Sequence, residues 1–276
     1  MPELANRQRV RAIGHRAAAA LRASGGCTTP LPDFHDAPYA MAGGEIIWTG
    51  KSGAMHPRAV FVSNPGSGEP LPVAGLTPWI APAISLDAAA VVRLRSALMQ
   101  LAASVALRAP SSGFAPLLAS RHLGFPLQAR RAVAVALARA ARADAPLLFS
   151  DAAARLLGLG GGLTPSGDDY VGGALFAVRA IYPGQRAWQA AAAGICGLAA
   201  SRTHAISAAL LADLAAGDSF AALHELVAGA AAGYGPAALV RIAGDLTAIG
   251  HSSGWDMLTG VIAATTGLPE DITAST

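Results

Sequence analysis

The chain has 276 residues, of which 53% are hydrophobic and only 13% are charged. The formal net charge is +3, and aromatic residues make up 5%. Because the arginines are spread along the chain, this balance argues against nucleic-acid binding and suits a small anionic metabolite. The low charged fraction predicts a large buried core and assembly into an oligomer.

The sequence gives no indication of a membrane or secreted protein. We expect no apolar run to be long enough to span a membrane. The apolar stretch between Arg16 and Arg22 is too short for the core of a signal peptide. Cys27 and Cys196 provide neither a disulfide framework nor the spacing of metal ligands. We therefore expect a cytoplasmic protein without membrane contact.

In chain order, the sequence predicts a helix, then strands, then helices. Residues 3–24 are expected to form the first helix, and residues 28–84 form a stretch rich in proline and glycine. Within it, Glu45–Thr49 and Ala59–Ser63 are typical of strands. Helices are then expected near 85–108, from Pro126, and near 151–157, 165–181, 186–216, 218–232, 236–249 and 254–265.

These elements predict an α+β fold. Because no strand pattern alternates with the later helices, the pattern argues against a doubly wound sheet. We expect residues 1–84 to form an N-terminal helix plus a small strand-rich domain. Residues 85–276 are expected to form a mainly α-helical domain that carries the motifs described next.

The segment GLGGGLTPSGDD, residues 158–169, is the first of these motifs. Its glycines free the backbone to turn N–H groups toward a ligand, Thr164 is interpreted as the N-cap of a helix, and Pro165 as its first residue. The positive end of that helix would favour an anion. The alternative is a glycine-rich helix end followed by a plain capped helix. The expected anion-binding residues are Gly160, Gly161, Gly162, Thr164, Ser166 and Gly167.

A second segment, GHSSGWDMLTG at 250–260, repeats part of the first. Both contain Ser-Gly-x-Asp followed by an apolar helix, so that Ser253 corresponds to Ser166 and Asp256 to Asp169. Each copy matches a Ser-x-x-Asp capping box, which gives Asp169 and Asp256 a structural role. Asp168 is left as the candidate for chemistry. The alternative is chance similarity between short strings.

Further candidates flank these motifs. Arg202 can clamp a carboxylate or phosphate, and His204, two residues later, can donate a hydrogen bond or move a proton. His251 precedes the second Ser-Gly-x-Asp turn. We predict Asp168, His204 and His251 as catalytic residues, and Arg202 and Ser253 as further anion-binding residues. Each also has a plain alternative as a surface or helix-capping residue. No cofactor is certain, but Asp168 and Asp169 are the expected ligands if Mg²⁺ binds.

Three blocks of the sequence resemble the AllH-like family, whose members are described as oxamate carbamoyltransferase subunits. These blocks are GLGGGLTPSGDDYVGG, SRTHAISAALL and GHSSGWDMLTG, and the resemblance covers roughly residues 150–276. It implies a role in purine (allantoin) catabolism, in which oxalurate and phosphate give oxamate and carbamoyl phosphate. It also implies FdrA-like and AllG-like partner subunits.

Two functions therefore remain open at the level of sequence. In the first, the chain is a subunit of a carbamoyl- or acyl-transferring enzyme and binds carbamoyl phosphate, phosphate or oxamate at the glycine-rich helix start. In the second, it is a non-catalytic partner or scaffold subunit, or an uncharacterised carboxylase-like protein. A stand-alone metal-dependent hydrolase is disfavoured because the sequence lacks a dense cluster of His, Asp and Glu.

Overall fold

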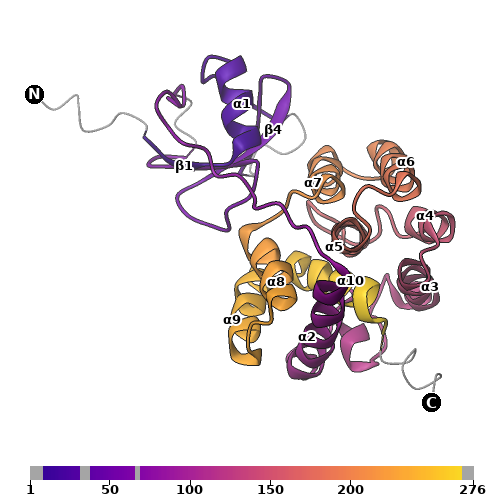
Figure 1. Ribbon diagram of the computed structural model, residues 1–276. Helices are drawn as coiled ribbons and strands as arrows, with labels where there is room; N and C mark the ends of the chain where they lie inside the picture. Colours follow the sequence, from indigo (N-terminus) through magenta and orange to yellow (C-terminus); the bar gives the residue numbers. More distant parts are fainter. Residues whose placement is uncertain (1–8, 32–37, 66–68, 269–276) are drawn as a thin grey trace, which may run out of the picture. The chain divides into compact units, whose positions relative to one another are not determined.

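The computed structural model describes residues 9–31, 38–65 and 69–268, and the chain forms two compact units (Figure 1). Unit 1 comprises Met1–Pro82 together with Ser219–Ala221, and unit 2 comprises Ala83–Asp218 and Ala222–Thr276. The β-rich N-terminal part and the mainly helical C-terminal part confirm the predicted α+β class.

Unit 1 is built on a five-stranded sheet with the strand order β1-β5-β4-β3-β2. Only the β4–β5 pair is parallel, and the other three pairs are antiparallel. The side chains of Ala17 and Leu21 on α1 belong to the core cluster that contains Ile47 and Val60 of the sheet. The elements are β1 (Val10–Ile13), α1 (His15–Ala23), β2 (Thr29–Pro30), β3 (Tyr39–Ala42), β4 (Glu45–Gly50) and β5 (Ala59–Val62).

The start of this unit differs from the prediction of one helix over residues 3–24. Val10–Ile13 forms strand β1, and the helix begins only at His15. Val10 and Ile13 are both buried, and they pair with Val62 and Val60 of β5. Pairing with this apolar strand therefore outweighs the helical tendency of the local sequence. Residues 3–8 lie outside the described part of the chain.

Among its described residues, unit 2 consists of helices joined by loops, without a strand. Most helix positions agree with the prediction, and the two β runs predicted in unit 1 are confirmed as β4 and β5. The helices are α2 (Ala88–Ala106), α3 (Arg131–Arg142), α4 (Pro146–Ala154), α5 (Ser166–Ile181), α6 (Arg186–Arg202), α7 (Ala205–Ala216), α8 (Ala221–Ala232), α9 (Pro236–Thr247) and α10 (Ser253–Thr266), with short 3-10 turns at Ala115–Ala119 and Gln128–Arg130.

Two of the predicted helices are wrong in a way that matters for the site. The helix expected over 186–216 is two helices, because Thr203 is extended with φ −138° and ψ 178° and ends α6. The helix expected at 151–157 is α4, which begins at Pro146 and ends at Ala154. Ser150 lies inside α4, and its hydroxyl donates to the carbonyl of Pro146.

Helices α5 and α10 form the centre of unit 2. Every residue of α5 is buried except Arg179 and Ile181, and α10 is buried from Asp256 to Thr265. In Figure 1, α5 lies among the surrounding helices of this unit, with α10 beside it. Their apolar residues therefore form the core, and the polar residues at their N-terminal ends require partners inside the protein.

The described residues include two stretches that are long and apolar enough to cross a membrane by length and composition. They are Ala88–Ala106 and Ala205–Ala232, so the expectation that no such run exists was wrong. The second stretch is divided into α7 and α8 by the break at 217–220. Apolar core helices of soluble proteins pass the same test.

Candidate functional site

The glycine-rich loop between α4 and α5 is held in place by backbone contacts. The N–H of Gly167 donates to the carbonyl of Leu159 at 2.8 Å. The N–H of Gly158 donates to Asp168 Oδ1, also at 2.8 Å. A Cβ on Gly158 would lie 2.2 Å from the carbonyl oxygen of Arg202, so the loop passes directly against the end of α6. The N–H of Gly167, predicted to bind an anion, is therefore engaged within the protein.

Asp168 connects three parts of the chain through hydrogen bonds to its carboxylate, whereas the sequence had suggested no structural role for it. Besides Gly158, its carboxylate accepts hydrogen bonds from Thr203 Oγ1 and, at 2.7 Å, from Ser207 Oγ. Its side chain is buried, at 2% exposure. The carboxylate thus ties the glycine-rich loop and the start of α5 to the break between α6 and α7. It also gives a physical reason why the helix breaks there, since Thr203 turns its hydroxyl to Asp168.

The two capping boxes predicted from the Ser-Gly-x-Asp repeat are not formed. The N-caps are Pro165 for α5 and Ser252 for α10, and neither donates or accepts a side-chain capping bond. The expected N-cap Thr164 instead lies 2.8 Å from Ser253, measured between their hydroxyl oxygens. The hydroxyls of Ser166 and Ser252 are 3.4 Å apart. The two motifs therefore pair with each other across the helix starts.

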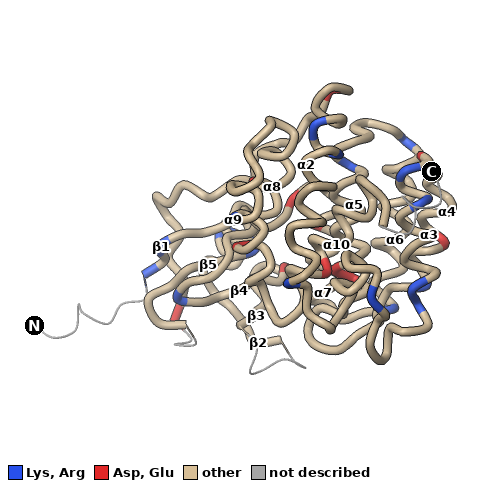
Figure 2. Tube along the Cα trace, turned by 90° about the horizontal axis from the view of Figure 1, so that it is seen from below, with Lys and Arg blue, Asp and Glu red and all other residues tan. Residues whose placement is uncertain are grey.

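Asp169 and Asp256 lie beneath these hydroxyls. Asp169 is 5% exposed and Asp256 is fully buried. The hydroxyls of Ser253 and Thr164 lie beside the carboxyl of Asp169, and those of Ser166 and Ser252 lie beside the carboxyl of Asp256. Figure 2 shows acidic residues gathered beside α10 and α7. We call the two acids and these four hydroxyl residues the acid–hydroxyl cluster.

The environment of the cluster favours the protonated, uncharged form of Asp169 and Asp256. Burial raises the pKa of Asp256 to about 7, against the opposing effect of its hydrogen bonds from the Phe114 N–H and the serine hydroxyls. Burial is also the main cause that raises the pKa of Asp169 well above its ordinary value, and the charge of Asp256 adds to it. Two ionised carboxylates at this position would repel each other in a medium that screens them poorly.

Sequence reasoning missed the segment that covers Asp256. The N–H of Phe114 donates to Asp256 Oδ1 at 2.6 Å. A Cβ on Gly113 would lie 2.2 Å from the same oxygen, and the φ of Gly113 is +61°. The only local signal is the turn Ser111-Ser112-Gly113, which gives no indication of a partner 142 residues later in the chain.

The other predicted residues lie at the surface. Gly161, Gly162, Arg202, His204 and His251 are exposed, and Gly160 is half-buried. The backbone of Arg202 touches the loop at Gly158, whereas His204 is the N-cap of α7. The structure thus brings the loop and Arg202 together, and it brings Ser253 to Thr164. Among the described residues, no group of three or more His, Cys, Asp and Glu side chains is arranged to hold a metal ion.

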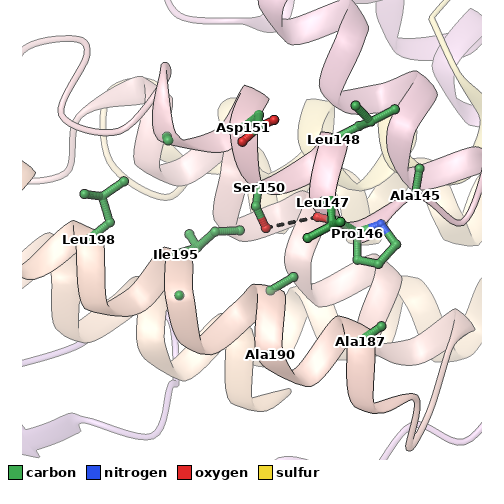
Figure 3. A pocket seen from close by; sticks show the side chains of 13 residues that line it. Ala145, Pro146, Leu147, Leu148, Ser150, Asp151, Ala187, Ala190, Ile195 and Leu198 are labelled. Carbon is green, nitrogen blue, oxygen red and sulfur yellow. Dashed lines mark hydrogen bonds between the residues drawn. The ribbon is translucent and has the colours of Figure 1, made fainter.

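A separate apolar groove of about 820 Å³ lies between α4 and α6 (Figure 3). Leu147 and Leu148 line it and are 82% and 64% exposed. Asp151 is its one charged lining residue. With no cationic side chain in its lining, this groove does not suit a small anion. Its lining is Ala145, Pro146, Leu147, Leu148, Ser150, Asp151, Ala154, Ala187, Ala190, Ala191, Gly194, Ile195 and Leu198.

These observations define a helical domain in which two helix starts of similar sequence form hydrogen bonds with each other beside two buried acids. The family model described as "Oxamate carbamoyltransferase subunit AllH" matches residues 156–265. This segment contains the glycine-rich loop, the break between α6 and α7, and the second motif. The resemblance to the AllH family is therefore confirmed over these residues. No curated protein and no solved structure was found to match the chain.

Proposed function

We propose that the chain is a subunit of an oxamate carbamoyltransferase of purine (allantoin/oxalurate) catabolism. The single observation that carries this proposal is the family match, which spans both Ser-Gly-x-Asp motifs. In such a reaction the carbamoyl group moves between the nitrogen of oxamate and an oxygen of phosphate. The bond between the carbamoyl carbon of oxalurate and its bridging nitrogen breaks as a C–O bond to phosphate forms. The proton that phosphate loses passes to the released nitrogen, and the products are oxamate and carbamoyl phosphate.

We further propose that the chain binds a small anion, namely carbamoyl phosphate, phosphate or oxamate, at the loop before α5. Gly161 and Gly162 are exposed and lie just before the N-terminal end of this helix. Backbone N–H groups and the helix dipole favour an anion in this position. Thr164 is half-buried beside them and can contribute its N–H.

The proposed roles of the other residues follow from their contacts. Arg202 would neutralise the anion, because its backbone lies against Gly158 and its exposed side chain belongs to the same end of α6. His204 and His251 are exposed and able to exchange protons with a bound substrate. Asp168 would act as a positioning residue, since its carboxylate is engaged by three donors that hold the loop against the α6–α7 break.

A scaffold subunit is the second candidate function. The groove between α4 and α6 favours it, because exposed leucines of this kind are typical of assembly surfaces. In this case the anion site would be completed only in a complex with FdrA-like and AllG-like subunits.

The test is equilibrium titration of the purified chain with carbamoyl phosphate, phosphate and oxamate, alongside thermal unfolding. We expect at least one of these anions to bind and to raise the melting temperature, and Arg202→Ala to abolish the effect. Arg186→Ala, an exposed arginine at the other end of α6, is the matched control and should bind normally. Binding that appears only in the reconstituted complex supports the scaffold function. Binding that Arg202→Ala leaves unchanged would contradict the proposed site.

A further inference from the structure

The acid–hydroxyl cluster contains two acids that lack a counter-charge. Within the described residues, neither Asp169 nor Asp256 forms an ion pair with a basic side chain. Leaving two carboxylates buried in this way is costly unless a proton or a cation neutralises them. The absence of an arginine, lysine or histidine partner is therefore a property of the site that requires an explanation.

Each acid also has an oxygen atom without a hydrogen-bond partner among the described residues. These atoms are Asp169 Oδ2 and Asp256 Oδ2, and both are buried. The other oxygen of Asp256 accepts from the N–H of Phe114. Buried polar atoms are normally satisfied, so two orphaned carboxylate oxygens at one place indicate a missing partner.

The polar side chains of the cluster supply only oxygen atoms. Hydroxyls come from Thr164 and Ser166 at the start of α5 and from Ser252 and Ser253 at the start of α10. The two hydroxyl pairs are 2.8 and 3.4 Å apart. Carboxylate and hydroxyl oxygens are the kind of ligand that a hard cation such as Mg²⁺ prefers. Zinc is disfavoured, because the cluster contains no cysteine or histidine.

We propose that the acid–hydroxyl cluster is a binding site for one hard divalent cation such as Mg²⁺. The carboxylates of Asp169 and Asp256 are its charged ligands, and the hydroxyls of the cluster complete the oxygen shell. The cation joins the starts of α5 and α10 and removes the repulsion between the two acids. This pair of carboxylate ligands differs from the pair expected from the sequence, Asp168 and Asp169. The oxygens of Asp168 already accept hydrogen bonds from Gly158, Thr203 and Ser207.

The burial of the cluster indicates a structural role for the cation. Gly113 and Phe114 close the site over Asp256, whereas Thr164, Ser252 and Ser253 are half-buried and form its side toward solvent. Because the two helix starts must come together to form the site, cation binding is coupled to the stability of unit 2. The proposal is independent of the anion site, since cation binding is measured without any substrate.

The experiment uses the full chain after removal of metal with EDTA. Calorimetric titration with Mg²⁺, Ca²⁺ and Mn²⁺ is combined with thermal unfolding and with the electron paramagnetic resonance signal of Mn²⁺. We expect one cation per chain, a higher melting temperature in its presence, and binding weaker by on the order of tenfold or more in Asp169→Asn and in Asp256→Asn. Asp151→Asn is the matched control, because Asp151 is exposed on α4, and it should bind as the original chain does.

Two further variants keep the test decisive. Asp168→Asn should lower stability but keep the cation, because Asp168 is not a ligand. Ser252→Ala leaves both carboxylates in place and should also weaken cation binding. It replaces the asparagine variants in the test if circular dichroism shows that they do not fold. Binding that survives in Asp169→Asn, Asp256→Asn and Ser252→Ala would overturn the proposal. Failure of all three cations to bind the original chain would also overturn it.

Discussion

The backbones of α5 and α10 touch where Gly173 meets Met257. A Cβ on Gly173 would lie 2.2 Å from the carbonyl oxygen of Met257, and a Cβ on Gly260 would lie 2.1 Å from the carbonyl oxygen of Tyr170. Tyr170 and Met257 each follow the aspartate of their own Ser-Gly-x-Asp motif. The sequence repeat is therefore matched by a reciprocal contact between the helices, which brings their N-terminal ends together.

This contact predicts that Gly173→Ala and Gly260→Ala each destabilise the protein strongly. The added methyl group meets a main-chain carbonyl that cannot move without separating the helices, so we expect a loss on the order of 3 kcal/mol in the free energy of unfolding. Gly197→Ala in α6 is the matched control, because nothing lies within 4 Å of its Cβ. Urea denaturation should show this control to be as stable as the original chain or up to about 1 kcal/mol more stable. Equal stability of all three variants would exclude the close contact.

The brace formed by Asp168 gives a second prediction. Asp168→Asn replaces an acceptor of three hydrogen bonds by an amide that leaves at least one buried donor unsatisfied, so we expect a loss of about 2–4 kcal/mol. Thr203→Ala and Ser207→Ala each remove one donor and should cost about 1 kcal/mol. Asp151→Asn serves as the control. A stable Asp168→Asn variant with no activity would restore Asp168 as a catalytic group.

Local patterns were sufficient to predict the fold class and most helices. The predicted strands Glu45–Thr49 and Ala59–Ser63, chosen for their β-branched and aromatic residues, correspond to β4 (Glu45–Gly50) and β5 (Ala59–Val62). The repeat between the two motifs was visible in the sequence as well. These features depend on neighbouring residues, which is why they can be read without a structure.

The partners of the polar side chains were not predictable in the same way. A serine three residues before an aspartate satisfies the rule for a capping box, as Ser166 and Ser253 do. Because the two helix starts converge, Ser166 instead pairs with Ser252, and Ser253 pairs with Thr164. The hydrogen-bond partners of Asp168 were missed for the same reason. They include Thr203 and Ser207, which lie more than thirty residues further along the chain.

The cover over Asp256 gives a third prediction. Gly113→Ala should destabilise the protein by two separate effects, since φ is +61° and the new Cβ would lie 2.2 Å from Asp256 Oδ1. Gly184→Ala tests the effect of the positive φ alone, because the φ of Gly184 is +77° and nothing lies within 4 Å of its Cβ. We expect a loss of about 1 kcal/mol for Gly184→Ala and a clearly larger one for Gly113→Ala in chemical denaturation. Similar losses would show that Gly113 does not pack on the carboxyl.

The buried histidine of unit 1 gives a prediction about pH. His56 is 3% exposed, and its ring lies 4.9 Å from that of Phe220 and 6.3 Å from that of Trp48 between ring centroids. Burial, assisted by the charge of Arg58, lowers the pKa of His56 from 6.5 to about 3. The unfolded chain therefore binds a proton below pH 6.5 that the folded chain does not bind until about pH 3. The resulting stability is present above pH 6.5 and is lost as the pH falls toward 3.

This loss should approach a slope of about 1.4 kcal/mol per pH unit. Asp256 acts in the opposite sense between pH 3.8 and about 7, because its pKa is raised in the folded chain. The contribution of His56 is therefore obtained as a difference, by urea denaturation of the original chain and of His56→Gln at several pH values from 7.5 to 4. We expect the original chain to lose more stability than His56→Gln over this range. Parallel pH profiles would mean that His56 takes up its proton equally in the folded and unfolded chains.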